Sequence, residues 1–565
     1  MRLGSVLGMM AGISAAAATA MAAPTPTPPA SASASASAST GLAPKLVVVI
    51  AVDQFSLDLY RTYAPGFTGG LKRLSAGRVF TGYQSHAATE TCPGHSTLLT
   101  GDHPNKTGIV ANNWYDRQTG SNLYCVSQTG TADEQAKSSA LLKVDTLGDW
   151  MRGAQRDGRV YSVSGKDRAA IMMAGHHPNG VYWWDDGIGF NTSSYAGPDT
   201  AETRRPAEAF NRQVLADWAA NPPALWSASA AATCKARTRP FTIGRLTWTD
   251  EVPPATNAEA KTGEGWMVSS AFAAELRASP LFDRTTLRFA ETLLDQHRLG
   301  RGPGRDILAI SLSATDYIGH RFGPGGAQMC AQMAELDAAL GELFARLDAT
   351  GAPYVVALSA DHGSIDVAER LGPPAQRVEP NATLRELGGY LRKTVGLEYD
   401  PIVSADPRQL VLGLGPVDNQ RRPAITRAIV DWLNARPEVA RAFTADEVAA
   451  AVPAKDKPVE QLTLAERFNE SFDRDRSGDI IIAWKDGASL GLPGSLTDTV
   501  AGHGSPWDYD RQVPILFWWP GISGGTEARS METVDIAPTL APMLGVTPPA
   551  GIDGHCVELG QGCRR

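Results

Sequence analysis

Long hydrophobic runs are scarce in this chain of 565 residues. Beyond the N-terminal 23 residues, no segment reaches the roughly 18 uninterrupted apolar residues that a membrane-spanning helix needs. An excess of positive charge is also missing, because the formal net charge is -8 and the pI is about 5.8. Such a chain has no basic field with which to hold a polyanion. We therefore expect neither stable membrane insertion nor a nucleic-acid partner.

Cysteine is infrequent, with six in the whole chain. Six cysteines in an exported protein can form up to three disulfides. However, Cys92 adjoins a threonine that is a candidate nucleophile, and Cys330 lies in a helical pattern. We expect these two to stay unpaired and two bridges to form among the cysteines at positions 125, 234, 556 and 563. Cys556 and Cys563 are close enough to pair with each other, and the alternative is that all four are free.

The N-terminal region has the composition of an export signal followed by a tether. Residues 1–23 combine an arginine at position 2, an Ala-rich apolar stretch and small residues suited to cleavage. A membrane anchor is the alternative, but no stop-transfer flank follows. Residues 24–40 contain little besides Pro, Thr, Ser and Ala and have nothing to bury. We expect a single catalytic domain over residues 41–565, in a periplasmic or secreted protein.

Short aliphatic runs alternate with helical stretches through the rest of the chain. The runs are apolar on both faces and cover residues 46–52, 160–163, 307–312, 354–358 and 514–517. This pattern predicts an α/β fold, with a central and largely parallel sheet flanked by helices. Residues near 180–300 and near 375–480 interrupt the alternation. We interpret them as insertions that cap the sheet, because candidate site residues lie on both sides of each.

Polar residues that could bind a metal ion or take part in a reaction follow several of the predicted strands. They are Asp53, Lys166, Asp316 and Asp361. The carboxyl ends of parallel strands meet at one edge of a sheet, and ligand sites of α/β sheets lie there. We therefore expect these side chains to gather at one rim, although they are far apart in the sequence.

The residue types at this rim are typical of a metal centre. Asp316 and His320 are four residues apart, so that a helix presents them on one face. His503, between two glycines, can complete their site. Mixed Asp and His ligands favour Zn²⁺ over Ca²⁺ or Mg²⁺, and two ions about 4 Å apart can act on one reaction centre. We predict two zinc ions, the second held by Asp53, Asp361, His362 and the hydroxyl of Thr91.

The order Asp, Thr, Asp-x-x-x-His, Asp-His, His resembles the alkaline phosphatase superfamily. The segments 108–116, GIVANNWYD, and 164–168, SGKDR, are similar to its phosphate-irrepressible bacterial type, in which a threonine is the nucleophile. The resemblance covers most of residues 44–547 and implies an alkaline-phosphatase-like fold. It also implies that Thr91 forms a phosphothreonine, while Asn112, Lys166 and Arg168 contact the phosphoryl oxygens.

Three alternatives remain beside an exported zinc-dependent phosphatase. A sulphatase is disfavoured, because Thr91 cannot become formylglycine. A phosphodiesterase or nucleotide pyrophosphatase shares the zinc ions and the threonine, but its substrate has two non-bridging oxygens and not the three that the cationic pair Lys166 and Arg168 suits. A binding protein on a degenerate hydrolase core is disfavoured by the complete ligand set. We expect small phosphate monoesters as substrates, and a monomer, with a dimer as the alternative.

Overall fold

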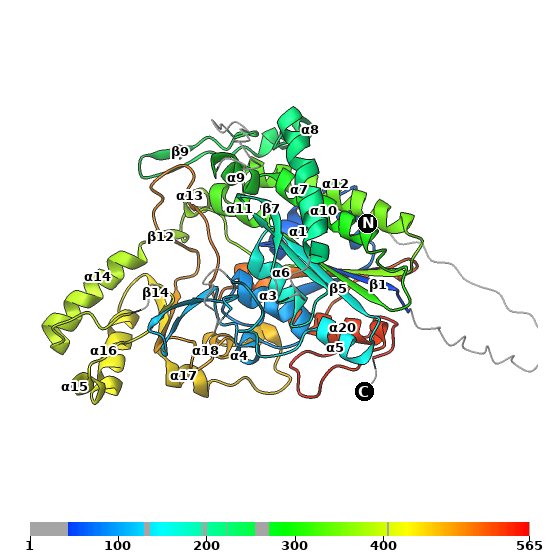
Figure 1. Ribbon diagram of the computed structural model, residues 1–565. Helices are drawn as coiled ribbons and strands as arrows, with labels where there is room; N and C mark the ends of the chain where they lie inside the picture. The colour runs from blue at the N-terminus through cyan, green and yellow to red at the C-terminus, as the bar shows by residue number, and fades with distance from the viewer. Residues whose placement is uncertain are drawn as a thin grey trace, which may run out of the picture. The chain divides into compact units, whose positions relative to one another are not determined.

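A large sheet lies at the centre of the computed structural model (Figure 1). The structure describes residues 43–128, 136–193, 195, 201–221, 223–254, 270–403 and 406–563, so the predicted signal peptide and linker lie outside the described residues. Ten of the described strands form the sheet in the order β18-β2-β17-β11-β1-β10-β5-β6-β7, with β19 also paired to β2. Their bounds are β1 Leu46–Val52, β2 Arg78–Tyr83, β5 Arg159–Ser164, β6 Gly180–Asp185, β7 Gly189–Thr192, β10 Asp306–Leu312, β11 Tyr354–Ser359, β17 Gln512–Trp518, β18 Gly525–Thr526 and β19 Met531–Glu532.

The middle of this sheet is parallel and its flanks are partly antiparallel. Strand β1 pairs in parallel with both β10 and β11, and Leu46 lies opposite Asp306 and Tyr354. Strands β10, β5 and β6 continue the parallel arrangement. By contrast, β17 is antiparallel to β11 and to β2, and β7 is antiparallel to β6. The predicted α/β class with a largely parallel sheet is confirmed, and the run at 514–517 belongs to the antiparallel strand β17.

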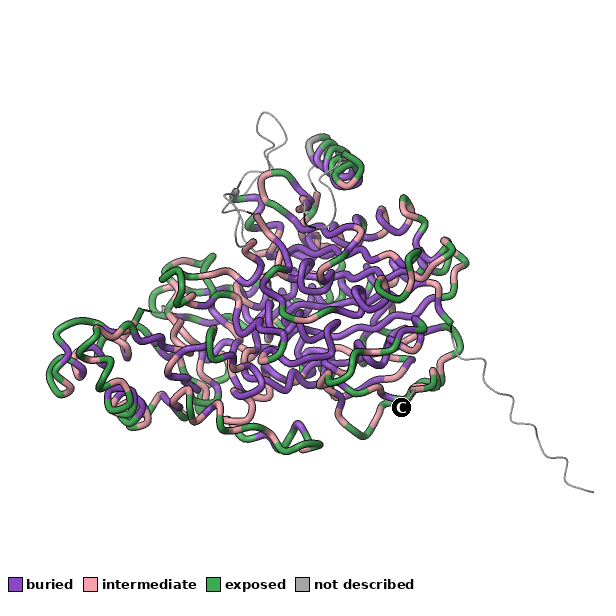
Figure 2. Tube along the Cα trace, turned by 60° about the horizontal axis from the view of Figure 1, so that its bottom comes forward, coloured by how far each residue is buried: buried purple, intermediate pink, exposed green. Residues whose placement is uncertain are grey.

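Helices cover both faces of the sheet because alternate residues of its strands are apolar on each side. In β1, Leu46, Val48 and Ile50 pack in one core with α10 and α12, while Val47 and Val49 pack in the other with α3, α5 and α20. Figure 1 shows these helices on opposite sides of the sheet, and Figure 2 shows buried residues concentrated in the interior and exposed residues at the periphery. The helix bounds are α1 Leu57–Tyr63, α2 Gly70–Ser75, α3 Thr91–Thr100, α4 Pro104–Thr107, α5 Leu147–Ala154, α6 Asp167–Ala174, α7 Ala201–Ala220, α8 Ala228–Cys234, α9 Ser270–Arg277, α10 Pro280–Gln296, α11 Ala314–Phe322, α12 Ala327–Ala349, α13 Ala368–Leu371, α14 Pro380–Tyr390, α15 Pro416–Asn419, α16 Arg422–Asn434, α17 Ala445–Ala450, α18 Leu464–Asn469, α19 Asp508–Arg511 and α20 Ile536–Leu540.

Large parts of the two segments interpreted as insertions form structures outside the central sheet, although β6, β7 and α10 of the first segment belong to the sheet and its covering helices. The first carries α7 to α10 and the hairpin of β8 (Phe241–Ile243) with β9 (Leu246–Trp248). The second carries α14 to α18 and a small antiparallel sheet in the order β13-β15-β14, formed by Gln409–Leu410, Ile480–Trp484 and Val439–Thr444. Two further strand pairs are β3 (Asn113–Asp116) with β4 (Ser121–Tyr124), and β12 (Gln376–Val378) with β16 (Ala488–Leu490).

The disulfides differ from the sequence prediction. All six cysteines lie in described residues and form three bridges, which join Cys92 to Cys125, Cys234 to Cys330, and Cys556 to Cys563. The last pair is confirmed, whereas the expectation that Cys92 and Cys330 stay unpaired is wrong. Cys92 N, in the first turn of α3, donates to Asn112 Oδ1 just before β3, and α12 packs on α8. Tertiary packing thus brings together cysteines whose sequence separations are 33 and 96.

Among the described helices, none is both long and apolar enough to cross a membrane.

Candidate active site

Four adjacent parallel strands deliver the predicted residues to one rim of the sheet. Asp53 follows β1, and its backbone N-H donates to Leu312 O at the end of β10 (2.9 Å). Asp316 lies in the first turn of α11, directly after β10. Asp361 follows β11, and Lys166 stands between β5 and α6. Because β11, β1, β10 and β5 are neighbours in the sheet, the predicted convergence at the rim is confirmed.

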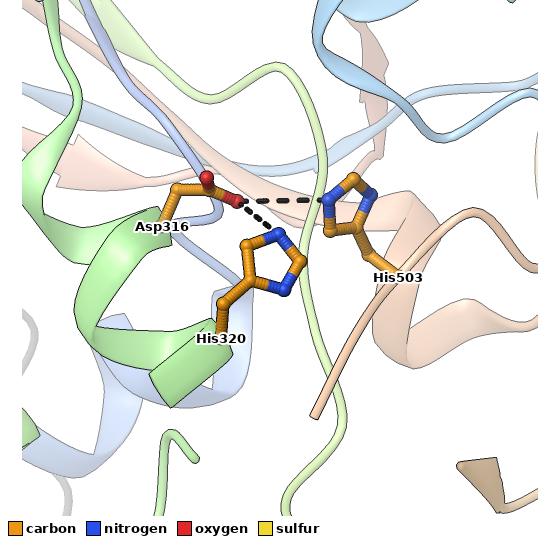
Figure 3. A group of neighbouring side chains, drawn as sticks. All are labelled: Asp316, His320 and His503. Atoms are coloured by element: carbon orange, nitrogen blue, oxygen red, sulfur yellow. Dashed lines mark ion pairs between the residues drawn. The ribbon is translucent and has the colours of Figure 1, made fainter. Parts of the chain in front are cut away.

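One group of metal-type donors forms around Asp316 (Figure 3). Asp316 Oδ1 lies 3.2 Å from His320 Nε2 and 3.6 Å from His503 Nε2. The other ring nitrogen of each histidine bonds a backbone carbonyl, His320 Nδ1 with Ala501 O (2.8 Å) and His503 Nδ1 with Thr89 O (2.7 Å). Such bonds fix the ring and leave Nε2 to face a metal ion.

A second group lies deeper at the same rim. His362 Nε2 is 3.6 Å from Asp53 Oδ1 and 3.4 Å from Asp361 Oδ2, and His362 Nδ1 bonds Gly363 O (3.0 Å). Asp53 Oδ1 and His362 Nε2 are buried and have no hydrogen-bond partner among the described residues. Buried polar atoms normally find partners, so these two atoms fit ligands of a divalent cation. Asp361 Oδ2, which also has His95 Nδ1 at 3.1 Å, lies beside them and can join the same site. We name the two groups together the strand-end cluster: Asp53, Asp316, His320, Asp361, His362 and His503.

The electrostatics of the strand-end cluster also favour added positive charge. Burial and the Asp361 carboxylate raise the pKa of Asp53 well above its usual value. Burial opposes ionisation of Asp316 too, but His320 and Lys166 outweigh it and hold its pKa well below the usual range. Lys166 Nζ lies 2.6 Å from both Asp53 Oδ2 and Asp316 Oδ2. Three buried carboxylates close together cannot all ionise without several cations beside them.

Thr91 begins helix α3 at the edge of this cluster. Its side chain is buried, and Arg168 Nη2 donates to Thr91 Oγ1 at 3.4 Å. Thr91 therefore stands at a helix N-terminus, as predicted, where the dipole and the free N-H groups favour anionic oxygens. Asn112 Oδ1 accepts from Cys92 N (2.8 Å), which leaves the Asn112 amide nitrogen as the donor that a ligand can use. A Cβ added at Gly94 would lie 2.0 Å from Asp361 O, so this glycine lets α3 approach the cluster.

Two residues that contact the site, Gln54 and Arg408, were missed by the sequence analysis. Gln54 adopts a φ of 66° and donates from its backbone N to Asp361 Oδ1 and from Nε2 to Asp316 Oδ1, both at 3.0 Å. Arg408 donates to His503 O (2.7 Å) and to Glu90 (3.2 Å). The position of Gln54 directly after a strand-end aspartate is the signal that could have found it. His95 packs beneath the site, with Nδ1 2.9 Å from Thr91 O and 3.1 Å from Asp361 Oδ2.

A cavity of about 570 Å³ opens beside the cluster. Asn112, His320 and His503 form part of its wall. Trp114, Arg408 and Trp484 also line the cavity. Arg408 and Trp484 come from the segment around the β13-β15-β14 sheet. A group attached to a substrate at Thr91 would therefore contact this segment.

Comparison with known proteins agrees with this geometry. A family model for type I phosphodiesterase / nucleotide pyrophosphatase matches residues 47–506. The chain belongs to this family, which is part of the alkaline phosphatase superfamily, and the predicted resemblance is thereby confirmed.

Individual relatives match over nearly the full length. The chain is 39% identical to alkaline phosphatase PhoD of Zymomonas mobilis, with 91% of this chain and 88% of the relative covered. It is also 39% identical to alkaline phosphatase PhoK of a Sphingomonas species, with 92% of each chain covered. The crystal structure of alkaline phosphatase PafA superposes with a TM-score of 0.76 at 27% identity, and covers 91% of this chain and 98% of that one.

Proposed function

We propose that this chain is an exported, zinc-dependent alkaline phosphatase that hydrolyses phosphate monoesters through a phosphothreonine at Thr91. The observation that carries the proposal is the convergence of a buried threonine hydroxyl, Lys166 and Arg168 on the strand-end cluster. The relatives that are 39% identical over most of the chain are named alkaline phosphatases, which supports the same activity here.

A solved variant of PafA supports the choice of site residues. It carries substitutions of a threonine, an asparagine, a lysine and an arginine, and superposes with a TM-score of 0.75 at 26% identity. Its threonine and asparagine are 21 positions apart, and its lysine and arginine are two apart. Thr91 to Asn112 and Lys166 to Arg168 have the same spacings.

Two zinc ions fit the donor sets already described. Asp316, His320 and His503 would hold one, and Asp53, Asp361, His362 and the Thr91 hydroxyl would hold the other. When bound, the ions supply the positive charge that lowers the pKa of the nucleophilic hydroxyl and stabilises developing negative charge on the substrate oxygens.

The chain's own residues would then orient and stabilise the reacting group. Thr91 Oγ attacks phosphorus while the bond to the leaving oxygen breaks, and water later cleaves the bond between phosphorus and Oγ. Arg168 already contacts Thr91 Oγ1, and Lys166 and the Asn112 amide lie at the same rim, so all three can bind non-bridging oxygens. A monoester dianion has three such oxygens and a diester has two, and this difference favours monoesters.

Export is supported by the cysteines. Disulfides persist in oxidising compartments, and all six cysteines are paired. We therefore propose a periplasmic or secreted enzyme, consistent with the predicted signal at residues 1–23.

Diester hydrolysis is the second candidate activity, because the matching family model is named for phosphodiesterases and nucleotide pyrophosphatases, and the adjoining cavity has room for a second ester group. The test is kcat/KM for an aryl phosphate monoester and for the matching methyl aryl diester, at pH 8 with zinc, for wild type and Lys166→Ala/Arg168→Ala. We expect a monoester preference that collapses in the double variant. Arg392→Ala/Lys393→Ala, two exposed positions, is the matched control. A diester preference that does not respond to the Lys166 and Arg168 changes would contradict the monoesterase proposal.

A further inference from the structure

A second set of histidine and carboxylate donors lies at the opposite end of the nucleophile helix. It consists of His103, Glu470 and Glu532, whose donor atoms lie within 4.8 Å of one another, and we name it the helix-end cluster. Thr91 begins α3, and His103 follows its last residue by three positions. At 1.5 Å per residue the helix separates the two ends by about 15 Å. The helix-end cluster is therefore distinct from the strand-end cluster.

The spacing of these donors suits a shared cation better than direct contacts. His103 Nε2 lies 3.6 Å from Glu532 Oε2 and 3.8 Å from Glu470 Oε2. Both separations exceed a normal N-H···O bond, but they are close to the roughly 3.4 Å between tetrahedral ligands of an ion bound at about 2.1 Å. At the strand-end cluster, His362 to Asp53 and His503 to Asp316 show the same 3.6 Å separation.

The Glu470 carboxylate provides an independent indication of a missing partner. The residue is 9% exposed, and its Oε2 is fully buried and accepts no hydrogen bond from any residue that the structure describes. This is the oxygen that faces His103. A buried carboxylate oxygen without a hydrogen bond is costly, and Arg511, the nearby cation, donates instead to Ser85 O and Asp508. A cation between Glu470 and His103 would remove this cost.

Ser85 is the hydrogen-bond partner of the other ring nitrogen of His103, with Oγ 2.9 Å from Nδ1. A hydroxyl can accept as well as donate. When Ser85 Oγ accepts the N-H of Nδ1, the lone pair of a neutral His103 lies on Nε2, which faces both glutamates. This hydrogen-bond arrangement matches that of zinc-binding histidines.

We propose that His103, Glu470 and Glu532 bind a divalent transition-metal ion, with zinc as the best match, outside the catalytic centre. One imidazole and two carboxylates form a donor set suited to zinc, with a further position for water. The exposed part of the Glu532 side chain, 31%, provides an entry from solvent. The three ligands come from the loop after α3, the end of α18 and β19. The ion therefore ties the segment around α18 to the core at the far end of the nucleophile helix.

The test is the zinc content of the full-length protein after chelation, incubation with zinc chloride and removal of free zinc. We expect Glu470→Gln/Glu532→Gln to retain one zinc ion per chain fewer than wild type. The exposed pair Glu386→Gln/Glu398→Gln is the control and should bind as much as wild type. Because the readout is a difference in zinc content, it does not depend on the proposed catalytic activity.

Two further measurements test the proposal even if the double variant folds poorly. Glu532→Gln alone, at a partly exposed side chain, should also lose one zinc ion and should show a smaller rise in Tm on addition of zinc than wild type, because binding to the folded state stabilises it. Crystals of the wild-type protein with zinc should give an anomalous peak among His103, Glu470 and Glu532. Equal zinc content in wild type and variants, or the absence of that peak, would overturn the proposal and leave the cluster as an ion-paired histidine.

Discussion

The strand-end and helix-end clusters contain the same kinds of donor at the same spacing, yet they differ in what surrounds them. At the strand ends, a threonine hydroxyl and two cationic side chains stand beside the donors. At the helix end, the neighbours of His103 are acidic: burial acts to lower its pKa, but Glu470, Glu532 and Asp553 outweigh this and raise it. Burial also raises the pKa of Glu532 to about 7. The comparison shows that similar donor sets can have different surroundings, and only the strand-end cluster has a hydroxyl and cationic side chains that could act on a reacting group.

Thr91, the proposed nucleophile, separates the two clusters most strongly. Thr91→Ala should lower kcat/KM for an aryl phosphate monoester by about 10³-fold or more, because it removes the hydroxyl that is proposed to form the covalent intermediate. Thr91→Ser keeps a hydroxyl at the helix N-terminus and should retain much of the activity. Steady-state kinetics on both variants checks this, and activity of Thr91→Ala close to that of wild type would contradict the proposed role.

Removing one histidine from each cluster compares them directly. His503→Ala should lower kcat/KM by at least the roughly 10- to 100-fold that loss of a metal-site partner costs. His103→Ala should lower it by less than tenfold and act mainly on stability. The exposed His177→Ala is the control. Kinetics and Tm measured on the same preparations separate effects on activity from effects on stability. Equal losses of activity in His503→Ala and His103→Ala would contradict the proposal that only the strand-end cluster is catalytic.

Helix α3 joins the two clusters, and Gly94 decides how closely it packs on the first. In Gly94→Ala the added Cβ would overlap Asp361 O, so we expect a loss of about 1–3 kcal/mol in unfolding free energy together with reduced kcat. Gly153→Ala in α5 is a matched control, since its Cβ would meet nothing within 4 Å in the described structure, and it should be neutral or stabilising by up to about 1 kcal/mol. Thermal unfolding of both variants tests the contrast, and similar effects at the two glycines would refute it.

The last comparison concerns the support of Asp316 and His320, where the expected effect is on the pH dependence of stability. Asp283 accepts a hydrogen bond from Ala314 N (2.8 Å), at the start of α11, and burial raises the pKa of Asp283 to about 6. Its folded pKa lies above the unfolded value of about 3.9, so the folded state retains a proton that the unfolded state has lost. The contribution of Asp283 to the stability of the wild-type protein should therefore decrease as the pH rises from about 4 to 6.

Asp283→Asn removes that titration. Its Tm relative to wild type should increase from pH 4 to pH 7, by an amount equivalent to at most about 3 kcal/mol. Gln332 can turn its amide to accept from the new asparagine, because Gln332 Oε1 has no hydrogen-bond partner in the described residues. The comparison is made with a chelator present so that metal binding does not contribute, and a Tm difference that stays constant with pH would contradict the assignment.

The position of the candidate site could be predicted because its ligands follow strands that the sequence marks clearly. The aliphatic runs before Asp53, Asp316 and Asp361 each predicted a buried parallel strand, and the topology of such strands places their carboxyl ends together. The bonds of His320 and His503 to backbone carbonyls could not be predicted, because their partners Ala501 and Thr89 have no distinguishing chemistry in the sequence.

The amino-acid sequence alone determined the α/β class, the rim at which the ligands gather and the residue types that define the family, because strand periodicity and motif order are local properties. Tertiary structure alone decided that Cys92 pairs with Cys125 and Cys330 with Cys234. It also decided the contacts of Gln54 and Arg408 with the site, and the meeting of His103 with Glu470 and Glu532. Each of these depends on the approach of segments that are distant in the chain. Such an approach follows from the packing of the whole core, to which no short pattern of residues corresponds.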